Sequence, residues 1–186
     1  MKRYGIPGCP SMNASEPSSA NAPEPNSRNA EPEYLWLDAA GIQPLVPSCP
    51  GSYLLLMFLP RPATICAGKL PRRTYTAGWY VYAGSALKGL RARLSRYVRP
   101  GRARHWHIDY LLEHACLRGA YILESPERYE CRLAARLAER LETVNGFGAS
   151  DCRCKSHLFH DSDEECMRTA ITFALSGRFT ISENIL

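Results

Sequence analysis

The segment Gly51–Leu59 limits the folds open to this chain more than any other feature. It reads GSYLLLMFL, and Pro60 and Pro62 close its continuously apolar run. A short apolar run between residues that interrupt regular structure is typical of a buried strand. We therefore expect a strand at this position.

Three other segments have the character of strands. Trp79–Ala83 reads WYVYA between two glycines, and aromatic and β-branched residues favour strands. Residues 64–67 and 120–123 give weaker strand signals. A basic loop, residues 68–76, separates the first of these weaker segments from Trp79–Ala83. Together they predict a small sheet.

Apolar residues recur at helical spacing in four other places. Residues 87–98 carry leucine and valine at steps of three and four, which predicts an amphipathic helix, and residues 108–115 repeat the pattern. Residues 125–143 begin with a Ser-Pro pair suited to the N-cap and the first helical position. Ser162 is expected to cap a last helix with an acidic first turn that ends near Gly177. The fold class is therefore mixed α/β (α+β).

The composition divides the chain into four parts. Residues 1–33 are rich in Ser, Pro, Asn, Ala and Glu, too polar to offset their ordering entropy, and predict a disordered leader. Residues 34–50 predict an extended lead-in, residues 51–160 the main domain and residues 161–186 a C-terminal helical extension. No apolar run is long enough for a signal peptide or a membrane span, so we expect a cytoplasmic protein.

Positive charge is concentrated in one part of the chain. The net charge is +5, yet no Asp or Glu occurs between Asp38 and Asp109. An acid-free stretch rich in arginine favours attraction of phosphate backbones, and DNA is the expected partner. The alternatives are a merely soluble basic surface and another acidic substrate. The residues that we expect to contact nucleic acid are Arg72, Arg73, Lys88, Arg91, Arg96, Arg99, His105 and His107.

Two tyrosines stand near the ends of the two best-defined strands. Tyr53 lies near the start of the first strand, and Tyr82 lies just before Gly84. In an antiparallel pairing both phenols would emerge on one face, beside a glycine that lets a phosphate approach the backbone. The competing interpretation is ordinary core packing.

An arginine and a glutamate lie close to the apolar stripes of two helices. Arg93 follows Leu90 by three residues, so its guanidinium is expected near the sheet, where it could stabilise negative charge. Glu130 occupies the N-terminal end of an apolar stripe, where a carboxylate needs a metal ion or a cationic partner. Glu127 is the reserve candidate. The alternatives are a snorkelling arginine and a structural ion pair.

The order of these residues resembles the GIY-YIG nuclease superfamily. The first motif reads Gly51-Ser52-Tyr53 and the second Tyr82-Ala83-Gly84, and they are followed at fitting distances by Arg93 and Glu130. This resemblance covers residues 51–160. It implies a small central three-stranded, mainly antiparallel sheet flanked by helices.

Two longer strings are similar to one branch of that superfamily, known as domain of unknown function 123. They are HWHIDY at residues 105–110 and FGASDCRC at residues 147–154. These strings are more specific than the short tripeptides. They strengthen the resemblance beyond the motifs themselves.

The resemblance implies an endonuclease that hydrolyses a DNA phosphodiester bond with one divalent ion, Mg²⁺ or Mn²⁺. Glu130 would hold the ion, and Tyr53 would orient or deprotonate the attacking water. Tyr82 would support that geometry, and Arg93 would stabilise the developing charge. Branched or damaged DNA, as in DNA repair, is expected by analogy. The alternative function is a non-catalytic nucleic-acid-binding module on a degenerate nuclease fold.

The chain departs from the superfamily pattern at three residues. Ser52 and Ala83 replace isoleucines, which we expect to alter packing more than chemistry. Ser85 stands where some relatives have a lysine. The long separation between the two tyrosine motifs implies an inserted strand and a basic loop.

The end of the main domain contains soft metal ligands. Cys152, Cys154 and His157 could bind Zn²⁺, with a fourth ligand from His105, His107 or His160. The alternatives are histidines that contact DNA and a packed, thiol-rich loop; a zinc-stabilised interaction domain is a third hypothesis for function. The cysteines that we expect to pack as small apolar residues are Cys66, Cys116 and Cys131.

Overall fold

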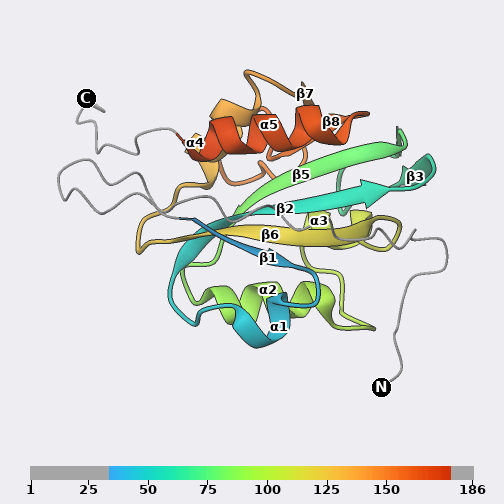
Figure 1. The fold of residues 1–186 in the computed structure, drawn as a ribbon. Helices are drawn as coiled ribbons and strands as arrows, with labels where there is room; N and C mark the ends of the chain where they lie inside the picture. Colours follow the sequence, from blue (N-terminus) through green and yellow to red (C-terminus); the bar gives the residue numbers. More distant parts are fainter. Residues whose placement is uncertain (1–33, 177–186) are drawn as a thin grey trace.

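A computed structural model describes residues 34–176, and its centre is an antiparallel sheet (Figure 1). The sheet has six strands in the order β1-β6-β2-β5-β8-β7. The expectation of three strands is therefore wrong, because further strands pair with both edges of the central group. The bounds of these strands are β1 (Tyr34–Asp38), β2 (Gly51–Leu59), β5 (Gly78–Ser85), β6 (Cys116–Glu124), β7 (Glu142–Thr143) and β8 (Leu158–Asp161).

Helices cover both faces of this sheet (Figure 1). One face carries α4 (Glu130–Leu137) and α5 (Glu164–Leu175), and the other carries α1 (Ile42–Leu45), α2 (Leu90–Val98) and α3 (His107–Leu111). The mixed α/β class is thus confirmed. Within residues 34–176, no helix has the length and apolar character needed to cross a membrane.

The two covered faces explain the apolar run in β2. Tyr53 and Leu55 belong to the core beneath α1, α2 and α3, whereas Leu54 and Leu56 belong to the core beneath α4 and α5. Successive side chains in a strand point to opposite faces, so a strand buried on both sides has no polar alternation. The predicted strand at residues 51–59 is confirmed.

The insertion between the two tyrosine motifs forms a separate hairpin. It consists of β3 (Ala63–Ile65) and β4 (Arg73–Tyr75), which make a two-stranded antiparallel sheet. The predicted strand at residues 64–67 corresponds to β3. The predicted basic loop contains β4, which the sequence did not indicate.

Residues 34–50 do not form an extended lead-in throughout. β1 pairs along its whole length with β6 and becomes an edge strand of the main sheet. α1 follows, and its Ile42 is fully buried with Val46 in the core beneath α2. Scattered apolar residues near the prolines therefore extend the core rather than lie along its surface.

Three predictions about helices and loops near the carboxyl end require correction. In place of the helix expected over residues 125–143, the structure has the shorter helix α4. It begins later than expected because Ser125 Oγ accepts a hydrogen bond from the Glu127 N–H in a turn before the helix. β7 forms where the end of that longer helix was expected, and the loop expected over residues 146–160 contains most of β8. α5 is capped by Asp163, whose carboxylate accepts from the Cys166 N–H, rather than by Ser162. The predicted leader, residues 1–33, and residues 177–186 of the predicted extension lie outside the described residues.

Candidate active site

One pocket of about 360 Å³ collects all four residues expected to carry the chemistry. Tyr53 reaches it from β2, Tyr82 from β5, Arg93 from α2 and Glu130 from the first turn of α4. The sequence thus predicted a real convergence of distant side chains. The full lining consists of Tyr53, Tyr82, Gly84, Ser85, Arg93, His105, Trp106, His107, Arg128, Glu130, Gly148, Ser150, Asp151 and His157.

The two phenols share one face because β2 and β5 are antiparallel neighbours. Tyr53 lies opposite Gly84 in the register, and both tyrosines belong to the core on the α2 side. A Cβ at Gly84 would lie 2.6 Å from the Tyr53 hydroxyl oxygen. Tyr53 therefore requires glycine at position 84.

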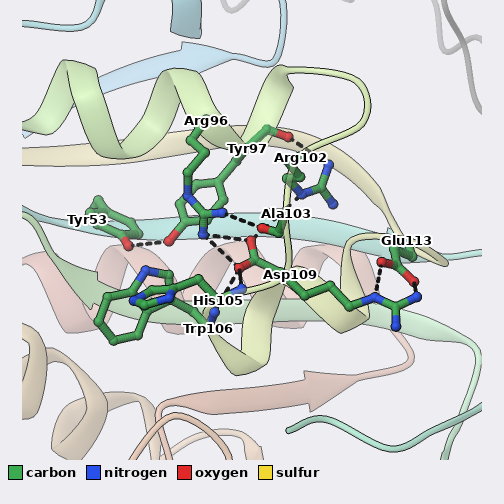
Figure 2. Close-up of polar contacts among 10 residues, drawn as sticks. Tyr53, Arg96, Tyr97, Arg102, Ala103, His105, Trp106, Asp109 and Glu113 are labelled. Carbon is green, nitrogen blue, oxygen red and sulfur yellow. Dashed lines mark hydrogen bonds and ion pairs between the residues drawn. The ribbon is translucent and has the colours of Figure 1, made fainter.

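A third tyrosine, Tyr97, completes this group and was not among the residues predicted from the sequence. The hydroxyls of Tyr53 and Tyr97 point at each other and form a hydrogen bond of 2.8 Å (Figure 2). Tyr97 lies on α2, four residues beyond Arg93 and on the same side of the helix. This helical spacing was the available signal, because residues four apart are neighbours on a helix surface.

Burial keeps these phenols protonated. Desolvation raises the pKa of Tyr53 well above its usual range, although the nearby Arg93 guanidinium opposes the shift. Burial likewise raises the pKa of Tyr82 and that of Tyr97. At neutral pH the hydroxyls in this structure are therefore hydrogen-bonding groups rather than phenolates.

Arg93 supplies a cation to the pocket. Its guanidinium stacks over the Trp106 ring at 4.5 Å from the centroid, and it lies near enough to Tyr53 and Tyr97 to oppose the rise in their pKa values. None of the ion pairs found among residues 34–176 uses Arg93. Its charge is therefore available for an anionic ligand.

Glu130 enters the pocket past the end of β5. Only 7% of its surface is exposed, and its carboxylate accepts a hydrogen bond of 2.5 Å from Ser85 Oγ. The backbone N–H of the preceding residue, Tyr129, donates to Ser52 Oγ at 2.9 Å. Ser52 and Ser85, the two serines at variance with the motif pattern, therefore hold the start of α4 and its carboxylate in place.

Arg128 also contacts a second carboxylate, that of Asp151. The Arg128 Nη1 is 3.2 Å from Glu130 Oε1 and 3.7 Å from Asp151 Oδ2. Asp151 is largely exposed and was not singled out from the sequence. One or two carboxylates beside a pocket are a donor set of the kind that Mg²⁺ uses. The residues present therefore fit a divalent ion.

The residues expected to contact nucleic acid divide into three groups. His105 and His107 line the pocket, and burial lowers the pKa of His107, whose Nδ1 accepts a hydrogen bond of 3.0 Å from the Gly148 N–H. Arg96 is occupied elsewhere, in an ion pair of 2.7 Å with the buried Asp109 (Figure 2). The remaining residues are exposed cations outside the pocket, namely Arg72, Arg73, Lys88, Arg91 and Arg99.

The soft ligands gather next to the pocket, and their fourth member differs from the histidine expected from the sequence. Cys131, Cys152, Cys154 and His157 have all their ligand atoms within 4.8 Å of one another. Cys131, from α4, takes the position expected for a histidine, and it is only partly buried. Cys131 lies near the other three ligands because α4 packs against the loop before β8. A contact between segments so distant in the sequence cannot be predicted from residue spacing.

The three histidines considered as the fourth ligand have other partners. His105 and His107 line the pocket, and His160 Nδ1 lies 3.2 Å from a Glu142 carboxylate oxygen. Cys66, also expected in the core, is exposed, whereas Cys116 is buried. Burial in the core is therefore confirmed for Cys116, whereas Cys66 is exposed and Cys131 is only partly buried.

Comparison with known proteins identifies one family. The family model described as Domain of unknown function DUF123 matches residues 52–179, more than half of the chain. No curated protein and no solved structure matches. The match covers the pocket, the cysteine and histidine cluster and the helix α5. This protein therefore belongs to the DUF123 family.

Proposed function

We propose that this protein is a metal-dependent endonuclease of the GIY-YIG type, which hydrolyses phosphodiester bonds in DNA. The observation that carries the proposal is the convergence of Tyr53, Tyr82, Arg93 and Glu130 in one pocket. These residues come from β2, β5, α2 and α4, which are distant in the sequence. Two hydroxyls, a cation and a carboxylate around one space suit phosphoryl chemistry.

The charges around the pocket support a phosphate-containing substrate. Arg93 pairs with no carboxylate among residues 34–176 and faces the pocket beside Trp106. Exposed cations near the hairpin and α2 extend the positive field, among them Arg72 and Arg99. Contacts of this kind grip a backbone without reading its sequence, so the proposal includes weak sequence preference.

Each residue has a distinct task in the proposed reaction. Glu130, with Asp151 as the neighbouring carboxylate, would hold Mg²⁺ or Mn²⁺, which supplies neutralisation of charge on the phosphate. The Arg93 guanidinium stabilises the charge that develops on the phosphate in the transition state. The Tyr53 hydroxyl, fixed by Tyr97, orients the attacking water, and Tyr82 supports that geometry from the neighbouring strand.

A second candidate is a module that binds DNA without cleaving it. The observation in its favour is that Glu130 is already engaged by Arg128 and Ser85, so the carboxylate has structural partners. This candidate shares the basic surface and the pocket. It differs from the endonuclease in one respect, because its Glu130 has no catalytic task.

A cleavage assay with a binding arm separates these candidates. Wild type, Glu130→Gln and the matched control Glu139→Gln, which changes an exposed glutamate just beyond α4, are incubated with duplex, flap and branched DNA and Mg²⁺. We expect Glu130→Gln to abolish cleavage while DNA affinity is retained, and Glu139→Gln to behave as wild type. Cleavage by Glu130→Gln at the wild-type rate would overturn the proposed site. Binding by the wild type without cleavage would establish the second candidate instead.

A further inference from the structure

The cluster of three cysteines and one histidine beside the pocket has the composition of a metal centre. Its ligand atoms, three thiol sulfurs and an imidazole nitrogen, all lie within 4.8 Å of one another. The Cys152 sulfur is 3.4 Å and the Cys131 sulfur 3.9 Å from His157 Nε2. Tetrahedral zinc, with bonds of about 2.0–2.3 Å, separates its ligand atoms by roughly 3.5–3.8 Å. The two distances to His157 Nε2 are close to this separation and the remaining pairs lie within 4.8 Å, so the cluster has the size of a Zn²⁺ site.

The chemistry of the cluster favours a metal over other uses of these side chains. All three cysteines are free thiols, and His157 is almost fully buried. A disulfide between two of these cysteines would use only two of the four groups and would leave the third thiol and the imidazole without a shared ligand. Zinc uses all four groups at once, and Cys₃His is a usual set for a structural zinc site.

The backbone around His157 is already held in a fixed position. The His157 N–H donates to the Phe147 carbonyl, and the His157 carbonyl accepts from the Ala83 N–H at 2.9 Å on β5. Ser156 Oγ donates to the Val144 carbonyl at 2.6 Å. The imidazole is thus presented at a defined point, as a ligand requires.

We propose that Cys131, Cys152, Cys154 and His157 bind a structural Zn²⁺ ion that fastens the first turn of α4 to the loop before β8. Cys131 directly follows Glu130, and the loop also supplies Asp151 and Gly148 to the pocket wall. The ion would therefore hold in place Glu130 and this loop, both of which line the pocket. This inference does not depend on the proposed endonuclease activity.

Metal analysis of the purified full-length chain tests the site directly. Elemental analysis by mass spectrometry should find one zinc per chain in the wild type, close to none in Cys154→Ser, and one in the control Cys166→Ser, which changes an exposed free thiol outside the cluster. Iron in place of zinc, no bound metal in wild type, or equal zinc loss in both variants would contradict the site.

A second measurement keeps the inference testable when Cys154→Ser does not fold. Addition of Co²⁺ to the metal-free wild-type chain should give the absorption of a tetrahedral cobalt centre with thiolate ligands, and Zn²⁺ should displace it. Spectra of octahedral cobalt, or a disulfide between two of these cysteines in protein purified under reducing conditions, would refute it.

The zinc site and the proposed activity can fail independently. Glu130→Gln should keep its zinc and lose cleavage. A variant that keeps cleavage without zinc would refute the structural role of the ion and leave the endonuclease intact. A chain that holds zinc but never cleaves DNA would refute the endonuclease and leave the zinc site intact.

Discussion

Close packing around the phenols makes single residues of the pocket intolerant of change. Gly84 is the clearest case, because its backbone lies against the Tyr53 ring. Packing against Tyr53 on the partner strand therefore requires the glycine of the motif Tyr82-Ala83-Gly84, in addition to any role of the motif in ligand binding. Gly148 repeats this relation to Tyr82, since a Cβ there would lie 2.7 Å from a Tyr82 ring carbon and its φ is +73°.

Substitution of Gly84 by alanine should displace Tyr53. A Cβ 2.6 Å from the Tyr53 hydroxyl forces the buried ring to move, and overpacking of this kind costs about 1–3 kcal/mol. We expect a lower midpoint in urea unfolding and loss of any cleavage activity. Wild-type stability and activity in Gly84→Ala would show that the ring has room to shift.

A matched residue-scale test concerns the hydrogen bond between Tyr53 and Tyr97. Tyr97→Phe removes the hydroxyl that holds the Tyr53 hydroxyl at 2.8 Å but keeps the ring. We expect a slower cleavage step with a loss of about 1–3 kcal/mol in stability, because a buried hydroxyl loses a partner. The substitution Tyr110→Phe, on a partly exposed ring outside the pocket, serves as the control. Equal rates in both variants would remove Tyr97 from the site.

At the scale of elements, α3 depends on a buried carboxylate. Asp109 accepts hydrogen bonds from the backbone N–H groups of His105 and Trp106, and both its oxygens accept from Arg96 (Figure 2). His105 and Trp106 line the pocket. Loss of this hydrogen-bond network would therefore destabilise α3 and also alter the wall of the pocket. Removal of one partner from a buried ion pair costs about 3–5 kcal/mol, which is the loss expected for Asp109→Ala in denaturant unfolding.

The same carboxylate should give the fold an acid-sensitive component. Burial alone would raise the pKa of Asp109, but the Trp106 and His105 N–H groups and the Arg96 guanidinium outweigh it, and the pKa is lowered. A lowered pKa means that Asp109 stabilises the fold above the usual carboxyl range, near about pH 4, and that this contribution is lost as pH falls through the lower folded value. Asp109→Asn should flatten the stability curve below about pH 4. An unchanged slope would refute this linkage.

The elements that sequence predicted well are those with a strong local pattern. β2, β5 and α2 each carry an apolar run or stripe that is visible within a short window. β7 and β8 are short strands, and β8 finds its partner β5 only once the chain has folded. Cys131 could not be predicted as a neighbour of Cys154 for the same reason. The two cysteines lie far apart in the sequence and come together only when the chain folds.

On the scale of the whole molecule, one acid-free part of the sequence supplies both exposed cations and an arginine of the pocket. The acid-free part of the sequence forms the hairpin and α2, and Arg93 of α2 places a positively charged guanidinium in the pocket. Arg96 shows that not every arginine in this stretch serves a ligand, because Asp109 already neutralises it. The exposed cations are therefore the better candidates for DNA contact.

Salt dependence of DNA affinity should measure these contacts. Each phosphate contact adds about −0.9 to the slope of log K against log salt. Arg99→Ala, which removes an exposed cation, should make the slope shallower by roughly that amount, whatever the DNA sequence. Glu139→Gln should leave the slope as it is. A slope near zero for the wild type would rule out binding through the DNA backbone.

We propose that the pocket residues act together on one phosphate, and a double-mutant cycle tests this joint action most directly. Single-turnover cleavage is measured for wild type, Arg93→Ala, Tyr53→Phe and the double variant in Mg²⁺. We predict that Arg93→Ala slows cleavage by about 10²–10³-fold and that the double variant is little slower than the worse single one, since residues acting as a unit are not additive. Wild-type rates in both single variants would contradict the account.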